Sequence, residues 1–202
     1  MNTEIAIFQI IVLVFSAIIH EYMHGWMADY LGDPTAKNAG RLTLNPLPHI
    51  DPFGSVILPF LLIMTGAGFV LGWAKPVPYN PYNLRDQKYG SAKVALAGPA
   101  ANLITALFFG LILRFAPLPN QDFSMYLEMI IFINLLLMVF NLVPIPPMDG
   151  SKILMSFLPY NLQVKYAKLE QYGMFLVILF VMFGFTLITP IIYFLFKLIV
   201  GF

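Results

Sequence analysis

Long apolar stretches separated by short polar ones dominate this chain. Residues 4–19 are apolar almost without a break, and a helical pattern continues to about Tyr30, where Gly32 and the pair Asp33-Pro34 end it. At 1.5 Å per residue, these roughly 27 residues reach about 40 Å, which is enough to cross the hydrocarbon core of a bilayer. The pattern therefore predicts a first membrane-spanning helix.

Four later apolar stretches predict further membrane segments. Residues 91–116 and 124–142 are typical of two more spanning helices, and residues 167–188 of another, which ends at a Thr-Pro pair and leaves a short apolar tail over 191–202. Residues 53–72 are also apolar, but glycines and a proline interrupt them. Irregular backbone at membrane depth is tolerated where protein or a cavity surrounds it, so this stretch favours a re-entrant or hairpin segment.

The polar segments between these stretches predict loops and one short helix. Residues 33–52 are rich in turn formers, and we expect a small extended or β region there. Residues 73–90 form a loop rich in proline, tyrosine and asparagine. Residues 143–149 contain three prolines and cannot be regular helix, and a short helix is expected from Gly150 to Leu158.

The expected fold is an all-α membrane protein, a polytopic helical bundle with four to six membrane segments. Residues 1–202 are expected to form a single domain, with a core over 1–160 and C-terminal helices over 161–202. Composition supports this: 59% of residues are hydrophobic and 10% are charged, whereas about a quarter of a soluble domain is charged. The net charge of +1 gives no basic field, so no nucleic-acid partner is expected.

The first apolar stretch carries an HExxH motif, His20-Glu21-Tyr22-Met23-His24. On a helix, the i, i+4 spacing places both imidazoles on one face, where both can reach one metal ion. Glu21 lies beside the first histidine and can act as general base towards a water that the metal activates. Ionisable residues inside an apolar span are costly, which makes them functional candidates.

Two histidines leave a catalytic zinc one protein ligand short. The chain has no cysteine, so the third ligand must be His49, Asp149 or another acid. Asp149 follows the proline-rich turn at the end of an apolar span, where a carboxylate could complete the site; it could instead cap the next helix. His49 lies in a turn-rich loop, which favours a structural or interfacial role.

Together, these motifs resemble the site-2 protease family of intramembrane zinc metalloproteases. HExxH in the first apolar helix is followed by NLVPIPPMDG at 141–150, and the stretches 40–59, 72–84 and AGPAANL at 97–103 are also similar to compact prokaryotic members, which lack PDZ and CBS domains. The resemblance covers nearly the whole chain.

The resemblance implies a function and a site. It implies regulated cleavage of transmembrane protein substrates within the bilayer, with one Zn²⁺ per chain on His20, His24 and Asp149 and with Glu21 as base. Asn141 and Asn102 match two asparagines of the family's motifs. Either amide could orient substrate or bind the oxyanion, or it could make hydrogen bonds between helices.

Charge and ligand depth together predict an orientation. The ligands meet at one depth only if the first helix and 124–142 point the same way, with 91–116 as the return span. The loops 31–52, 73–93 and 143–168 then share one side. They hold Lys37, Arg41, Lys75, Arg85, Lys88, Lys93, Lys152, Lys165 and Lys168. Only Arg114 falls clearly opposite, so the positive-inside rule predicts that the active site faces the cytoplasm. The resemblance to compact prokaryotic members implies that the membrane is a prokaryotic inner membrane.

Three other functions remain open at this point. Intramembrane His and Asp beside a broken helix also suit a membrane metal-ion transporter. A non-proteolytic protein that binds transmembrane segments would share the fold, and a prenyl-protein peptidase would share HExxH but would complete its site differently. The pattern does not determine the substrate, the activating signal or the oligomeric state.

Overall fold

The computed structural model describes residues 3–57, 60–61, 64 and 73–201, and its elements are almost all helical. The bounds of the longer helices are α1 Thr3–Tyr30, α4 Gly90–Phe115, α5 Gln121–Asn141, α6 Asp149–Phe157, α7 Tyr160–Ala167, α8 Gly173–Leu179 and α9 Phe185–Val200. Shorter ones are α2 Thr35–Asn38, η1 Leu47–His49, η2 Pro52–Ile57, η3 Pro81–Asn83, η4 Lys168–Tyr172 and η5 Phe180–Gly184. No strand occurs among the described residues.

Four helical stretches are long and apolar enough to cross a membrane. They are Thr3–Tyr30, Gly90–Phe115, Gln121–Asn141 and the composite Tyr160–Val200. These lengths confirm the predicted fold class, an all-α polytopic membrane protein. The first three agree with the predicted spans to within a few residues, because each is bounded by a loop with turn-forming residues.

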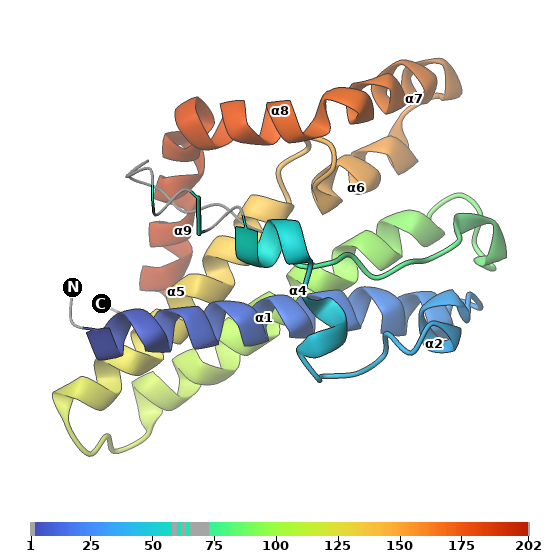
Figure 1. Cartoon of the computed structure of the whole chain (residues 1–202). Coiled ribbons are helices and arrows are strands. Elements are labelled where there is room, and N and C mark those ends of the chain that lie inside the picture. Colours follow the sequence, from blue (N-terminus) through green and yellow to red (C-terminus); the bar gives the residue numbers. More distant parts are fainter. Residues whose placement is uncertain (1–2, 58–59, 62–63, 65–72, 202) are drawn as a thin grey trace.

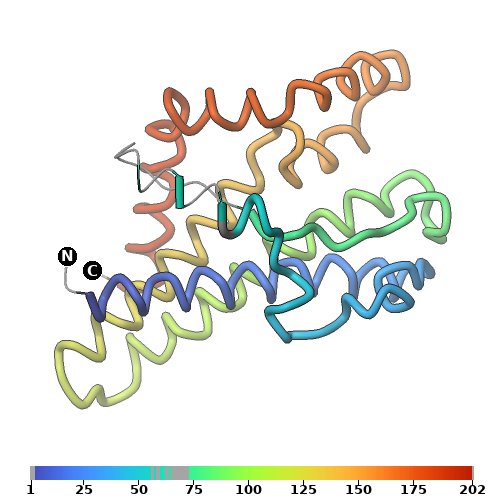
Figure 2. The backbone as a smooth tube through the Cα atoms, viewed as in Figure 1, coloured from blue at the N-terminus to red at the C-terminus, as the bar shows by residue number. Residues whose placement is uncertain are grey.

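Helices α1, α4 and α5 pack side by side, and α4 runs opposite to the other two (Figure 1). The tube in Figure 2 shows the same path: the chain leaves the N-terminus along α1, returns along α4 and leaves again along α5. The predicted ligands can share one depth only in this arrangement. His20 and His24 lie in the C-terminal half of α1, and Asp149 follows the C-terminal end of α5.

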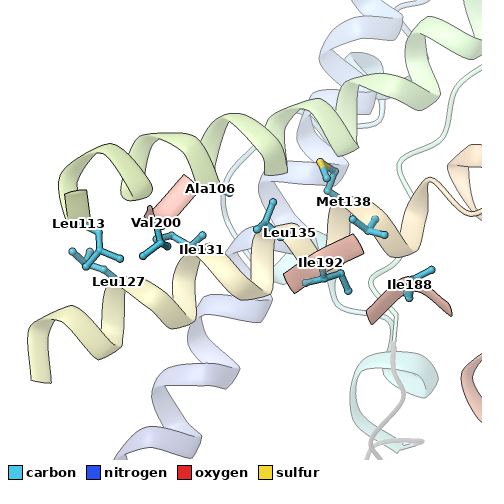
Figure 3. Packing of buried hydrophobic residues seen from close by; sticks show 10 residues of the cluster. Ala106, Leu113, Leu127, Ile131, Leu135, Met138, Ile188, Ile192 and Val200 are labelled. Carbon is cyan, nitrogen blue, oxygen red and sulfur yellow. The ribbon is translucent and has the colours of Figure 1, made fainter. Parts of the chain in front are cut away.

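The apolar core lies where α4, α5 and α9 meet. Its buried side chains, most of which Figure 3 labels, come from all three helices: Ala106, Leu113, Leu127, Ile131, Leu135, Met138, Val139, Ile188, Ile192 and Val200. Away from this cluster α1 and α4 expose large apolar side chains such as Ile10, Phe15 and Phe108. Such surfaces suit contact with lipid.

The C-terminal region departs from the prediction at one point. We expected Thr189-Pro190 to end a helix, yet Pro190 lies inside α9. The chain instead turns earlier, at η5, and α8 and α9 point in clearly different directions (Figure 1). Pro190 is close to the start of α9, so its missing N–H and its ring disturb only the first turns of that helix.

The segment after α1 also differs from the expectation. A small extended or β region was predicted over 33–52, but the described residues there form α2, η1 and irregular backbone without strand pairing. Hydrogen bonds from side chains take the place of hydrogen bonds between strands. For example, the Nε2 of His49 donates to the carbonyl of Thr43 at 2.9 Å. Most of the predicted re-entrant segment, 53–72, lies outside the described residues.

Candidate metal centre

The two imidazoles lie on the face of α1 that packs against α4. The Nδ1 of His24 lies 2.8 Å from the carbonyl oxygen of Val94, and the Nδ1 of His20 lies 2.6 Å from Oδ1 of Asn102. Because these oxygens can only accept, each Nδ1 carries the proton and each Nε2 keeps its lone pair. Both side chains are thus in the tautomer that a metal ligand needs.

A network of buried amides fixes the orientation of Asn102. Its Nδ2 donates to the carbonyl of Ser16 at 3.3 Å and to Oδ1 of Asn134 at 3.0 Å, and Nδ2 of Asn134 donates to the Ser16 hydroxyl at 3.0 Å. All polar atoms of the Asn102 amide are therefore engaged by protein. This arrangement favours the interhelical role that the sequence left open for Asn102 over a direct contact with substrate.

Sequence reasoning missed Ser16 and Asn134. Two signals were available: an asparagine alone in the middle of an apolar span, and a serine one helical turn before His20 on the same face. Polar residues inside membrane helices generally have a partner, but the pattern does not say which helix supplies it.

Gly98 lets α4 approach the imidazoles. A Cβ at this position would lie 2.5 Å from Nε2 of His24 and 2.6 Å from Nε2 of His20, closer than non-bonded atoms approach. Any larger residue would therefore displace the two groups that a metal would bind. The glycine permits a close approach of backbone to the site, as glycine does elsewhere.

Asp149 enters from the first turn of α6 and meets both histidines. Its Oδ2 lies 3.0 Å from Nε2 of His20 and 3.2 Å from Nε2 of His24. Two ligands about 2.0–2.1 Å from a tetrahedral zinc ion lie about 3.3 Å apart, so the separations fit a metal held between the three groups. Gly150 permits this approach, because a Cβ there would collide with the backbone of Leu142.

Glu21 completes the cluster from the side. One of its carboxylate oxygens and the ligand atoms of His20 and His24 all lie within 4.8 Å of one another, a grouping that could hold a metal ion. The Oε2 atom accepts a hydrogen bond of 2.8 Å from the backbone N–H of Val77. The carboxylate is thus half-buried and oriented by a loop outside its own helix.

A cavity of about 370 Å³ opens onto these four side chains. Apolar groups dominate its lining. The lining residues are His20, Glu21, His24, Trp73, Ala74, Pro76, Val77, Tyr79, Val94, Ala95, Phe140, Asn141, Pro147, Met148, Asp149, Lys152, Met174 and Val177. A concave, mainly apolar space with a few convergent polar groups is typical of a substrate site.

The remaining predicted candidates lie in different places. Asn141 lines the cavity and uses its Nδ2 to donate to the carbonyl of Leu137 at 2.9 Å. His49 is not part of the cavity lining in the described part of the chain, and its Nε2 donates to Thr43. The structure therefore brings His20, Glu21, His24, Asp149 and Asn141 to one cavity.

Fold and site together define a class: a polytopic membrane protein whose His, His and Asp side chains converge beside a glutamate. Comparison with known proteins agrees. Residues 112–184 match the model of peptidase family M50. "Putative zinc metalloprotease YwhC" of Bacillus subtilis is 36% identical over 196 residues, which span 91% of this chain and 81% of the relative.

Two further relatives carry similar names. "Putative zinc metalloprotease Rip2" of Mycolicibacterium smegmatis is 33% identical over 88% of this chain and 65% of its own length. "Putative zinc metalloprotease MJ0611" of Methanocaldococcus jannaschii is 33% identical over 76% of this chain and 73% of its own length. No solved structure matches the chain significantly.

The chain belongs to peptidase family M50, the site-2 protease family, as its motifs indicated. The expected cofactor agrees with this membership, since the relatives are named zinc metalloproteases and the group of His20, Glu21 and His24 could hold a metal ion.

Proposed function

We propose that this chain is a zinc metalloprotease that hydrolyses peptide bonds within or next to transmembrane segments of other membrane proteins. The observation that carries the proposal is the convergence of both Nε2 atoms on one Asp149 oxygen, at 3.0 and 3.2 Å, inside a bundle of membrane helices. Ionisable side chains inside a bundle of membrane helices are costly, so the convergence of three of them indicates a function.

His20, His24 and Asp149 would hold one zinc ion. Zinc, when bound, supplies Lewis-acid activation of a water molecule and of the scissile carbonyl. The donor set suits this ion, because two imidazoles and one carboxylate leave a further position open. The hydrogen bonds from Nδ1 of His20 and His24 keep both rings in the ligating tautomer.

Glu21 would be the general base. Its position one residue after His20 places its carboxylate beside the metal ligands, and the bond to the N–H of Val77 holds one of its two oxygens. The other oxygen has room to take a proton from the attacking water and to pass it to the leaving amine. The amide of Asn141, on the cavity wall, is available to bind the carbonyl oxygen of the substrate.

We infer that the substrate binds in an extended form. Backbone carbonyls inside a helix are engaged by intrahelical hydrogen bonds, whereas an extended stretch exposes the peptide carbonyl. The mainly apolar lining of the cavity suits the side chains of a transmembrane segment.

We further infer that residues 1–202 act as one membrane domain in a prokaryotic inner membrane, with the site towards the cytoplasm. Helices α1, α4 and α6 contribute to one cavity, and α9 packs against α4 and α5. The excess of lysine and arginine in the loops at the site's end of the bundle supports the orientation.

The test is cleavage in proteoliposomes that contain the purified full chain and a model single-span substrate. Wild type should cut within or next to the substrate's apolar segment, as mass spectrometry of the fragments reports. Glu21→Gln should bind zinc normally and lower the cleavage rate by at least about 100-fold. Glu128→Gln removes a membrane carboxylate from a separate cavity and serves as the matched control.

Two outcomes would contradict the proposal. Undiminished cleavage by Glu21→Gln would remove the general base from the mechanism. Zinc-loaded wild type that moves zinc across the vesicle membrane but leaves every substrate intact would favour a metal transporter instead.

A further inference from the structure

Two buried polar side chains outside the metal centre have no role in the mechanism so far. Arg41 is 7% exposed and His49 is 2% exposed, although both lie in the segment of short helices and irregular backbone that follows α1. A buried guanidinium is costly unless it is paired, yet no carboxylate within ion-pair distance of Arg41 occurs among the described residues. Its partners are backbone carbonyls.

Arg41 binds the segment that passes beside the metal centre. One guanidinium nitrogen donates to the carbonyl of Lys75 at 2.6 Å and lies 3.4 Å from that of Pro76. On the other side of the same residue, the N–H of Lys75 donates to the carbonyl of His49 at 2.8 Å. The 41–49 segment therefore holds residue 75 through both its donor and its acceptor.

The next residue that can donate a backbone hydrogen bond is Val77. Pro76 and Pro78 flank it, and proline has no N–H. Val77 is buried, and its N–H donates to Oε2 of Glu21 at 2.8 Å. Because proline fixes φ, the position of the Val77 N–H follows closely from the position of the carbonyls that Arg41 holds.

We propose that Arg41 is a positioning residue for the general base: by holding the carbonyls of residues 75 and 76, it directs the N–H of Val77 at Glu21. His49 supports the same geometry through its backbone carbonyl and through the bond from its Nε2 to Thr43. The inference rests on the proposed function, in which Glu21 is the base. It assigns a role to a residue that lines neither the cavity nor the metal centre.

Lysine should replace Arg41 poorly. The guanidinium is planar and presents several donors in fixed directions, whereas an ammonium is a compact charge on a flexible stem. A small guanidinium compound, in contrast, can enter the space left by Arg41→Ala and restore the same hydrogen bonds. These differences separate a positioning role from the mere presence of a positive charge.

The first experiment is amide hydrogen exchange of the full chain in detergent, read at Val77. Val77 has the one backbone N–H between residues 75 and 79, because residues 76 and 78 are prolines. A proteolytic peptide that covers this stretch therefore reports the exchange of Val77 with little interference. Wild type should protect this amide. Arg41→Ala should raise its exchange rate by at least about tenfold, as should Glu21→Ala, which removes the acceptor. Lys75→Ala removes an exposed cation but no hydrogen bond of the segment and should leave exchange unchanged.

The second experiment measures cleavage with the same variants. Arg41→Ala should lower kcat by about 10- to 100-fold, since small displacements of a reacting group have effects of this size. Zinc content and KM should stay near the wild-type values, because neither the ligands nor the cavity wall changes. Methylguanidinium should restore part of kcat in Arg41→Ala, and Arg41→Lys should recover little.

Two results would overturn the inference. One is a Val77 amide as protected in Arg41→Ala as in wild type. The other is a fall in kcat of Arg41→Ala that is accompanied by a lower zinc content or a lower thermal midpoint and that methylguanidinium does not reverse. If wild type itself cuts no substrate, the proposed function fails, while amide exchange still decides whether Arg41 directs Val77 at Glu21.

Discussion

Each imidazole of the proposed metal centre depends on a residue that lies on the opposing helix. His24 uses the carbonyl of Val94, which any residue supplies, whereas His20 uses the side chain of Asn102, which few residues can imitate. The two proposed zinc ligands therefore differ in their sensitivity to mutation of α4. HExxH spacing predicted the pair of histidines, but a single sequence cannot reveal which partner fixes each tautomer.

Replacing Gly98 with alanine tests the packing at this scale. The added Cβ would meet Nε2 of both histidines at 2.5–2.6 Å, so the rings or the helix must shift. We expect zinc affinity to fall by about 10- to 100-fold, the range typical of disturbed ligand support. Competition with a chelator of known affinity measures this.

Gly110→Ala is the matched control, because it makes the same substitution on the same helix but collides with Ile199, far along α4 from the site. It should lower thermal stability and leave zinc affinity intact. Equal zinc affinity in wild type and Gly98→Ala would show that the close approach of α4 is unimportant.

Helices α1 and α4 meet in a fixed antiparallel register. His20 and His24, one turn apart on α1, contact two residues that lie about two turns apart on α4: His24 contacts Val94, and His20 contacts Asn102. The helical period on α1 was predictable from the sequence. The register was not, because lipid-exposed and buried faces of membrane helices are both apolar and the usual contrast between them is lost.

The loops at the site's end of the bundle are joined by one buried carboxylate. Asp33 accepts hydrogen bonds from the N–H of Asn80 at 2.6 Å, from Nδ2 of Asn83 at 2.9 Å and from the hydroxyl of Thr35 at 2.5 Å. Burial raises the pKa of Asp33, but the hydrogen bonds from Thr35, Asn83 and Asn80 outweigh it and hold the pKa below its ordinary value of 3.8.

This lowered pKa predicts the direction of a pH effect. A group with a lower pKa in the folded state binds fewer protons there, so its stabilisation is complete at neutral pH and is lost as pH falls below about 4. Asp33→Asn should lower stability at pH 7 by about 1–3 kcal/mol, because buried donors lose their acceptor. It should also weaken the dependence of the thermal midpoint on pH between 5 and 3.

Asp29→Asn is the control, since the one side-chain interaction of Asp29 within the described part of the chain is a surface pair with Lys37 at 3.6 Å. A pair of this type contributes about 0–1 kcal/mol. A wild-type midpoint that is insensitive to acid across this window would contradict the role of Asp33.

At the scale of the whole molecule, composition and apolar run lengths were enough to predict the helical membrane fold. The common direction of α1 and α5 was predicted from the shared depth that the expected metal ligands require. Two features were not predictable in this way. The chain turns at η5 and does not end a helix at Thr189-Pro190, because proline is tolerated inside membrane helices, where neighbouring groups satisfy the freed backbone. The expected β region is absent from the described residues, because side-chain and turn hydrogen bonds satisfy the backbone locally.

The predicted orientation is testable with single cysteines, which the natural chain lacks. Cysteine at the exposed positions Lys37 and Lys165 should react with a membrane-impermeant maleimide only after the cells are permeabilised. Cysteine at Pro119, in the turn between α4 and α5, should react in intact cells. Labelling of positions 37 and 119 from the same side would contradict the orientation and the shared depth of the ligands.

The central claim is that Asp149 completes a zinc site with His20 and His24 that performs proteolysis. The most direct test compares zinc content and cleavage of a transmembrane substrate between wild type, Asp149→Ala and the exposed control Asp122→Ala. We expect about one zinc per chain in wild type and control, with both zinc and cleavage lost together in Asp149→Ala. Full zinc content and full activity in Asp149→Ala would contradict the account, because the ligand that links α6 to α1 would then have no part in the chemistry.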